Sequence, residues 1–464
     1  MIESQRFNTE FRTFSPMAEP IDIDAVPSMG IDVLLQAAFS NETQIPKPVL
    51  DLIPLPSITV SSLLKDPLPT PLHPSTINLR PAESCVTDLA ARWTVDELIK
   101  APIPSRTWLF DLEITLKNKW HTRIGVTSVR HPTISGLYLP LWIGNFWDSL
   151  IGAVEQKGEW RRAESWILGQ VQDARVYEAR ELLQQIPWGF RVWALTGADS
   201  SSLVGVLAGL LSTGWLRERH LDTLASYLNF RAGRDKKGAR ECWVGDVYLS
   251  MCLKRVYRAA KKTISADRDL EKYRDAITVH GYQRFFFPAN LDNNHWIVFG
   301  IDLVKKHFRY GEPSIFSESR DTSTHHRGDL GDSLGNRSPN TNLQHIRRGL
   351  ENWLEVAFGV SFKDMGNTLP IGRQKDGHSC GICVVNAIEH AMFDVPLFTD
   401  TDRYHLRIWY FVEAVKYLLN NVRVLFFTKS NDTYLDSSSI LRLRATVLLG
   451  LRTYRSQDLM KRQK

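Results

Sequence analysis

Apolar residues recur at helical spacing over several long stretches of this sequence. The stretches "IGNFWDSLIGAVEQKGEWRRAESWILGQV" (143–171) and "VYEARELLQQI" (176–186) place apolar residues three or four positions apart, which predicts helices with one apolar face. Further stretches with this spacing predict four more helices, over 215–230, 343–358, 380–393 and 404–419.

A strand pattern is clearest over residues 294–310. There "NHWIVFGIDLVKKHFRY" gives an apolar run, a turn with two lysines and a second, alternating run. This order is typical of a β-hairpin. Because the hairpin stands between helical stretches, the region from about 200 to 400 is predicted to be an α+β domain.

The same pattern divides the chain into four parts. Twelve of the 22 prolines lie in the first 81 residues, so residues 1–90 are expected to form a disordered, Pro-rich leader. Residues 91–198 hold nine of the 14 tryptophans and read as a mainly helical accessory domain whose tryptophans pack its core. The α+β domain covers 199–400, and 401–464 is expected to be a C-terminal helical extension.

Composition narrows the classes of protein that fit. An apolar content of 43% over 464 residues is enough for real cores, and 57 basic against 51 acidic residues is too even to indicate nucleic-acid binding. Neither a signal peptide nor a membrane span is expected, since the longest apolar run, 201–211, is short. Five cysteines suit a reducing, intracellular compartment, nucleus or cytoplasm.

The stretch "QKDGHSCGIC" (374–383) carries the candidate chemistry. If 380–393 is a helix, Cys380 lies in its first turn, where the helix dipole and unpaired N–H groups stabilise a thiolate. Cys383 lies one turn further on and should face the core. A redox pair would need a preceding thioredoxin-like strand, and a zinc site a second ligand pair; neither is found, so no metal is expected.

A thiolate nucleophile needs a base, and two histidines compete for that role. His378 is only two residues from Cys380 in an extended loop, which is poor geometry for an imidazole. His295 begins an apolar strand, so its ring should lie at the rim of a sheet. Together with an acid after the next strand and Gln374, it completes a set in which imidazole, carboxylate and amide activate a thiol and bind an oxyanion.

At these residues the sequence resembles the ubiquitin-like-protein-specific cysteine proteases of the Ulp and sentrin-protease type. The resemblance rests on "HWIVFGIDLVKKHFRY" and "GRQKDGHSCGICVV" and covers roughly residues 200 to 395. It implies a papain-like domain with His295 as base, Cys380 as nucleophile and Gln374 as oxyanion donor. It also implies that Trp296 covers the Gly-Gly tail of the substrate, and that Trp215, in "WLRERHLDTLASYL", belongs to the substrate site.

The sequence departs from the pattern of this family at two places. Ser379 stands where an aspartate is usual, which should be tolerated because that side chain is not catalytic. After "FRYG" the chain reads "EPSIFSESRDTSTHHRGDLG" before it reaches "DSLGN", so residues 312–331 look like an insertion within the motif. Glu312 keeps the direct spacing of seventeen residues from His295, and Asp332 keeps the local motif, which favours Asp332 as the acid.

A rival hypothesis comes from a different class of enzyme. "GDSL" (331–334) matches the nucleophile block of GDSL esterases, and "DRYH" (402–405) has the spacing of their other triad members, which would give Ser333, Asp402 and His405. Those enzymes carry the block near the domain start after an apolar strand, whereas here it follows a polar stretch.

The resemblance therefore implies a cysteine peptidase or isopeptidase that cleaves after the C-terminal Gly-Gly of a ubiquitin-like, SUMO-like modifier and needs no cofactor. Its expected partners are such a modifier or its conjugates. The non-enzymatic alternative is a degenerate protease domain that only binds a modifier or another protein. Which modifier is bound, and whether processing or deconjugation dominates, stays open.

Overall fold

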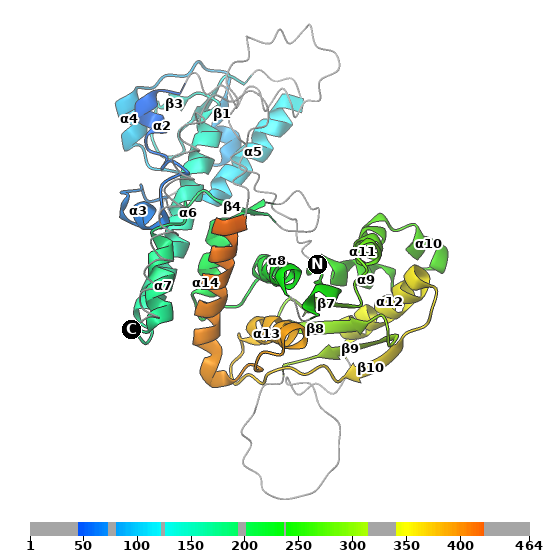
Figure 1. Cartoon of the computed structure of the whole chain (residues 1–464). Coiled ribbons are helices and arrows are strands. Elements are labelled where there is room, and N and C mark those ends of the chain that lie inside the picture. Colours follow the sequence, from blue (N-terminus) through cyan, green and yellow to red (C-terminus); the bar gives the residue numbers. More distant parts are fainter. Residues whose placement is uncertain are drawn as a thin grey trace, which may run out of the picture. The chain divides into compact units, whose positions relative to one another are not determined.

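The computed structural model describes residues 45–72, 80–121, 126–193, 201–235, 238–313 and 340–421. These residues form two compact units (Figure 1). The first unit contains the described residues up to 161 together with 183–190. The second contains 162–182 and the described residues from 191 to 420, so helix α6 (Ile143–Leu168) begins in the first unit and ends in the second.

The first unit is mainly helical and has a core rich in tryptophan. A small antiparallel sheet, β1 (Val86–Thr87), β2 (Ser128–Arg130) and β3 (Tyr138–Leu139), accompanies the helices. The helices are α2 (Lys47–Leu50), α3 (Val60–Lys65), α4 (Val95–Lys100), α5 (Arg106–His121) and the first part of α6. Trp108, Trp142, Trp147 and Trp160 are all at most 6% exposed, which agrees with the prediction that the tryptophans of this region form a core.

Part of the segment expected to be a disordered leader is packed into the first unit. Within residues 45–72, the side chains of Val49 in α2 and of Val60 and Leu63 in α3 are buried, as is that of Ile45 before α2. Proline is compatible with these elements because the prolines of "IPKPVL" stand at the N-cap and in the first turn of α2, where a missing N–H group costs little. The expected boundary at residue 90 therefore differs from the structure.

The second unit is built on a five-stranded sheet in the order β10-β9-β8-β7-β6. Its strands are β6 (Cys242–Val244), β7 (Arg284–Leu291), β8 (His295–Asp302), β9 (His307–Gly311) and β10 (Lys363–Asn367). The central strands β7, β8 and β9 are antiparallel, and the two outer strands pair parallel to their neighbours. This mixed sheet with helices confirms the predicted α+β class.

Helices cover both faces of the central strands, which is why β7 and β8 are apolar almost throughout (Figure 1). Phe285, Phe287 and Phe299 pack in one core with helices from the segment 248–279 and with α12 (Thr341–Phe358). The helices of that segment are α9 (Tyr248–Val256), α10 (Lys261–Ser265) and α11 (Arg268–Val279). Against the opposite face packs α13 (Cys380–Phe393), which also contacts α8 (Glu218–Arg234).

The strand and helix predictions for this unit are confirmed in their main parts. The hairpin consists of β8 and β9, and its turn has Lys306 at a φ of 54°. Helices α12 and α13 match the predicted 343–358 and 380–393 closely. The helix predicted from residue 215 begins only at Glu218, so Trp215 lies in the segment that precedes α8, after β4 (Arg191–Trp193), β5 (Ser201–Leu203) and η4 (Val204–Leu210).

Helix α14 (Arg403–Asn421) belongs to the second unit through residue 420 and is not set apart from it at residue 400. The reason is its buried face, on which Tyr410, Phe411 and Val412 are fully enclosed. Lys416 of α14 also binds Glu178 of α7 (Ala174–Leu183) at 2.5 Å. Of the helices described, none combines the length and the apolar character that crossing a membrane requires.

Candidate active site

Cys380 is the first residue of α13, as the sequence predicts, and its side chain is fully buried. The first N–H groups of a helix have no acceptor within the helix, so the chain next to this thiol offers hydrogen-bond donors and the positive end of the dipole. Cys383, one turn later, is also fully buried, and burial raises the pKa of its thiol. The position of Cys380 is therefore the one suited to a thiolate.

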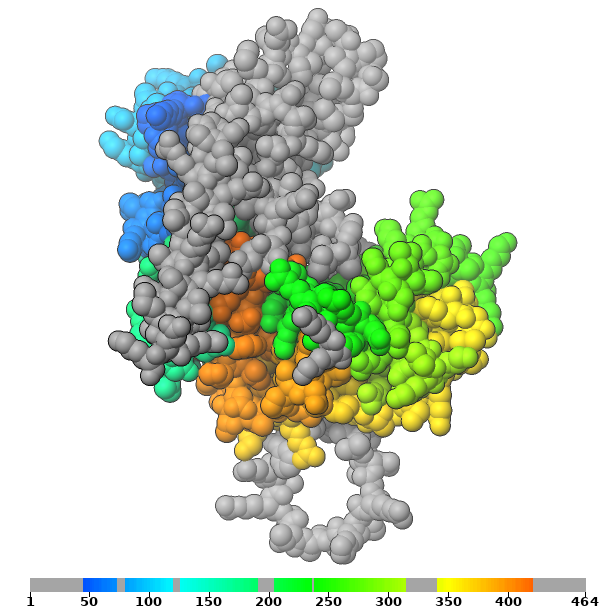
Figure 2. Space-filling model, in the orientation of Figure 1, coloured from blue at the N-terminus to red at the C-terminus, as the bar shows by residue number. Residues whose placement is uncertain are grey.

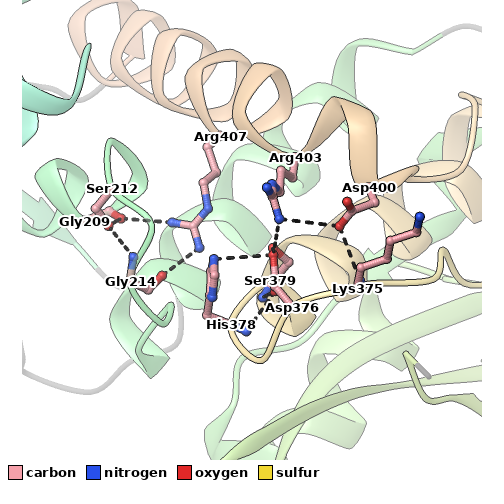
Figure 3. A network of polar contacts seen from close by, with 10 residues as sticks. All are labelled: Gly209, Ser212, Gly214, Lys375, Asp376, His378, Ser379, Asp400, Arg403 and Arg407. Carbon is pink, nitrogen blue, oxygen red and sulfur yellow. Dashed lines mark hydrogen bonds and ion pairs between the residues drawn. The ribbon is translucent and has the colours of Figure 1, made fainter. Parts of the chain in front are cut away.

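The loop before Cys380 is fixed by the carboxylate of Asp376 (Figure 3). Its Oδ1 atom accepts the backbone N–H groups of His378 and Ser379 at 2.9 and 2.7 Å, and its Oδ2 atom accepts the Ser379 hydroxyl at 2.7 Å. Arg403 of α14 donates to Oδ2 at 3.2 Å. Burial disfavours the charged carboxylate, but the hydrogen bonds from Ser379 and His378 outweigh it and lower the pKa of Asp376.

Asp376 is not among the residues that the sequence motifs predict for the site. The sequence did contain a pattern that could have indicated it: an aspartate readily accepts hydrogen bonds from the backbone N–H groups two and three residues later and so forms a local turn. Ser379, the departure from the family pattern, takes part in this turn through its hydroxyl group. The carboxylate that organises this loop is therefore that of Asp376, and Ser379 binds it through its backbone N–H group and its hydroxyl group.

His295 is the first residue of β8 and lies directly after a tight turn. Asp292 and Asn293 in that turn have φ values of 54° and 59°, a conformation that Asp and Asn adopt more easily than other side chains. The register pairs Leu291 with His295 and so leaves the imidazole at the end of the sheet. The prediction that His295 lies at the rim of a sheet is confirmed.

Glu312 is the acid that the structure brings to His295. Because β9 runs antiparallel to β8 and pairs Gly311 with Val298, the next residue returns toward the start of β8. The Oε1 atom of Glu312 lies 3.4 Å from Nε2 of His295. This is longer than a good charge-assisted hydrogen bond of about 2.8 Å. Asp332, which the local motif favoured, lies outside the described residues.

The surroundings of His295 favour its protonated form. Burial lowers the pKa of the imidazole, but the contacts with Cys380 and Glu312 outweigh burial and raise this pKa to about 9. Glu312 lies near Nε2 of the ring, and Cys380 acts on the same imidazole. The arrangement suits an ion pair between an imidazolium and a thiolate.

Gln374 lies at the start of the loop that precedes Cys380 and is 1% exposed. Its Oε1 atom is buried and has no hydrogen-bond partner among the described residues. A buried amide that is not fully paired is uncommon and calls for an explanation. The unpaired atom is an acceptor, whereas an oxyanion needs the Nε2 N–H donors of the same amide.

The two tryptophans expected at the substrate site differ sharply in exposure. Trp296 is 2% exposed and its indole N–H donates to the backbone oxygen of Leu216 at 2.7 Å, so it packs inside and does not stand open at the rim. Residues 296–301 of β8 are all buried because helices cover both faces of this strand, and Trp296 is the first residue of that buried run. Trp215, the neighbour of Leu216, is 44% exposed.

The residues of the rival esterase are not brought together within the described part of the chain. Ser333 lies outside the described residues. His405 contacts Asp173 at 3.6 Å, and Asp402 accepts the hydroxyl group of Thr399. His378, the other histidine considered as a base, faces Asp376 at 3.3 Å. No group of three metal-binding side chains occurs within the described ranges.

Comparisons with known proteins give structural likeness only. No protein-family model matches the sequence, and no curated protein does. The chain is similar to the SUMO protease Ulp1 with its catalytic cysteine oxidised to a sulfenic acid, with 16% identity and a TM-score of 0.36 over 54% of this chain and 97% of that one. It is also similar to the C-terminal Ulp1 protease domain in complex with Smt3, the yeast orthologue of SUMO (16% identity, TM-score 0.35, 53% and 96% covered).

A third similar structure is the Xanthomonas campestris effector protein XopD bound to ubiquitin, with 18% identity and a TM-score of 0.29 over 43% of this chain and 91% of that one. Two of these three structures are described as SUMO proteases or their protease domain, the class that the sequence motifs resemble. Identities and TM-scores this low leave the chemistry of the site to be argued from its own residues.

Proposed function

We propose that this chain is a cysteine peptidase in which Cys380, His295 and Glu312 act together. The observation that carries this proposal is the position of His295 between the thiol at the start of α13 and the carboxylate after β9. The three groups have different roles, since the thiolate attacks, the imidazole exchanges the proton, and the carboxylate orients and stabilises the imidazolium.

The proposed reaction is acyl transfer in two stages. The Cys380 thiolate attacks the carbonyl carbon, and the developing oxyanion accepts hydrogen bonds from Gln374 and from backbone N–H groups at the start of α13. The His295 imidazolium then gives its proton to the leaving amine, and a thioester remains. In the second stage His295 takes a proton from water, the hydroxide adds to the thioester, and the acid product and the thiol are released.

The proposed substrate is a ubiquitin-like modifier cleaved after its C-terminal Gly-Gly. Support comes from the motif resemblance around His295 and Cys380. A side-chain-free Gly-Gly tail also suits a nucleophile that is fully buried in the absence of substrate. The proposed partners are therefore such a modifier or its conjugates.

A ubiquitin-like modifier with an electrophilic C-terminus tests this proposal. We expect a covalent adduct on Cys380, located by mass spectrometry of the digested protein, and cleavage of a modifier–reporter fusion. Cys380→Ser should abolish both. Cys383→Ala is the matched control: its thiol is equally buried, so we expect activity within about threefold of the original and a stability loss of about 1 kcal/mol.

Equal loss from both cysteine substitutions would instead support a site that needs the pair. Binding of the modifier without any adduct would favour the second candidate function, a protease domain that only binds. That candidate has one observation in its favour: the fully buried Cys380 side chain lies next to a His295–Glu312 contact longer than a good hydrogen bond.

A further inference from the structure

Arg407 of α14 is a buried cation that the proposed mechanism does not use. Its side chain is 1% exposed, and among the described residues no carboxylate forms an ion pair with it. Its partners are two backbone oxygens: Nη2 donates to Gly214 at 2.6 Å and Nη1 to Gly209 at 3.4 Å (Figure 3). Burying a guanidinium against neutral acceptors is costly, so a role beyond packing is indicated.

The charge of Arg407 is balanced from a distance and not by contact. Burial lowers the pKa of the guanidinium to about 10, while the nearby Asp376 carboxylate and Cys380 act in the opposite direction. Arg403, one turn earlier on α14, is the arginine that binds Asp376 directly. The two arginines therefore serve different parts of the site, Arg403 the nucleophile loop and Arg407 the residues 209–214.

Residues 209–216 form a segment, called here the Trp215 segment, that is closed by its own hydrogen bonds. The Ser212 hydroxyl donates to the Gly209 oxygen at 2.8 Å and accepts the Gly214 N–H at 3.1 Å. Arg407 donates to the backbone oxygens of Gly209 and Gly214, the first and last residues of this turn (Figure 3). One guanidinium fork thus spans the whole turn.

The other end of the Trp215 segment is held by the neighbours of both catalytic residues. Trp296, next to His295, donates its indole N–H to the Leu216 oxygen. Gly381, next to Cys380, lies so close that a Cβ atom there would be 2.9 Å from the Cβ of Leu216. In the space-filling view the residues around α8, which follows this segment, adjoin those of α13 and α14 (Figure 2).

We propose that Arg407 is a positioning residue that fixes the Trp215 segment, so that the exposed indole of Trp215 confines the tail of the substrate beside Cys380. This inference rests on the function proposed above. Arg407 holds one end of the segment and Trp296 the other, and the 44%-exposed side chain of Trp215 stands between them. Arg407 itself touches no substrate.

The expected kinetic signature is a change in KM rather than in kcat. Arg407→Lys keeps the charge but loses the fork that reaches both oxygens, and Arg407→Gln loses charge and fork. For both variants we expect KM for a modifier–reporter fusion to rise about tenfold and kcat to change less than about threefold, the pattern of lost substrate binding. Alkylation of Cys380 by iodoacetamide, which needs no tail contact, should keep its rate within about twofold in Arg407→Lys.

Two further variants provide the comparison. Lys416→Gln removes a cation from the same helix, one bound to Glu178 and Glu413, and should leave KM and kcat unchanged. Trp296→Phe removes the N–H that holds Leu216 and keeps an aromatic ring, so it should raise KM as the Arg407 variants do. Combined with Arg407→Lys, its effect should be less than additive because both act on one segment.

Hydrogen exchange measured by mass spectrometry tests the proposal without any catalysis. In Arg407→Lys, peptides that cover residues 209–216 should exchange about tenfold faster than in the original chain, while peptides of α12 should be unchanged. Unaltered exchange over 209–216 would overturn the inference, and so would a loss of kcat or of alkylation with KM unchanged. If Arg407→Gln fails to fold, the exchange rates and KM values of Arg407→Lys and Trp296→Phe test the inference in its place.

The two proposals can fail separately. If the original chain forms no adduct with the modifier probe, the proposed function is refuted. If the original chain is active and the Arg407 and Trp296 variants behave like it, only this inference is refuted.

Discussion

The carboxylate of Glu312 lies 3.4 Å from Nε2 of His295, at the point where β9 ends beside the start of β8. The sequence left two candidates for the acid, Glu312 and Asp332. This contact favours Glu312, which lies seventeen residues after His295. The contact depends on the antiparallel pairing of β8 with β9 and does not require the sequence motif around Asp332.

Removing the Glu312 carboxylate should therefore impair catalysis. We expect Glu312→Ala to lower kcat/KM for a modifier–reporter fusion on the order of 100-fold, because His295 loses the group that orients and stabilises its imidazolium. Asp332→Ala should change kcat/KM less than about threefold. The local motif predicts the reverse order, so a large loss from Asp332→Ala with activity retained in Glu312→Ala identifies Asp332 as the acid.

Deleting residues 312–331 is a second test of the same contact. The deletion joins Gly311 to Asp332 and restores an acid seventeen residues after His295, as in the related motif. Because the acid then continues β9 directly, we expect kcat at least equal to that of the full chain, and a higher value if the shorter side chain makes a closer hydrogen bond. Inactivity with an intact thermal unfolding transition would mean that Asp332 cannot replace Glu312.

The two tryptophans near the site should respond differently to truncation. Trp296→Ala should cost about 3–5 kcal/mol in the free energy of unfolding, the usual penalty for a buried large aromatic side chain. Trp215→Ala should change that free energy by less than about 0.5 kcal/mol, because its side chain is 44% exposed, and should raise KM instead. Denaturant unfolding and steady-state kinetics separate the two effects; similar stability losses would place both in the core.

The pH dependence should reflect His295. Its pKa in the folded chain, about 9, is above its usual value, so the charged imidazolium stabilises the fold fully below pH 6.5 and this contribution is lost as pH rises through about 9. The leaving amine needs the same proton, so kcat/KM should fall with a midpoint near pH 9. Glu312→Gln should shift this alkaline limb to lower pH. An unchanged limb would show that Glu312 does not act on His295.

The sequence predicted those parts of the site that depend on local pattern. Apolar spacing located the start of α13 at Cys380, and the hairpin pattern located His295 at a strand start. The burial of Trp296 could not be predicted from the motif, because it involves a hydrogen bond to Leu216, a residue 80 positions earlier in the chain. The contacts of Arg407 with Gly209 and Gly214 join residues almost 200 positions apart, and no spacing rule covers such a distance.

The acid itself shows a different limit. A sequence motif describes the order of residues along the chain, whereas the register between strands determines which side chain contacts His295. In this chain the two kinds of information point to different residues, the motif to Asp332 and the register of β8 and β9 to Glu312.

The described residues that flank the stretch 314–339 contact His295 and the turn before it. Glu312 contacts His295 before this stretch, and Asn340 and Asn342 bind the carboxylate of Asp292 after it. Described residues on both sides of this stretch thus contact the β7–β8 turn and the start of β8. An epitope or fluorescent tag placed between residues 314 and 339 would report on this site from an internal position of the chain.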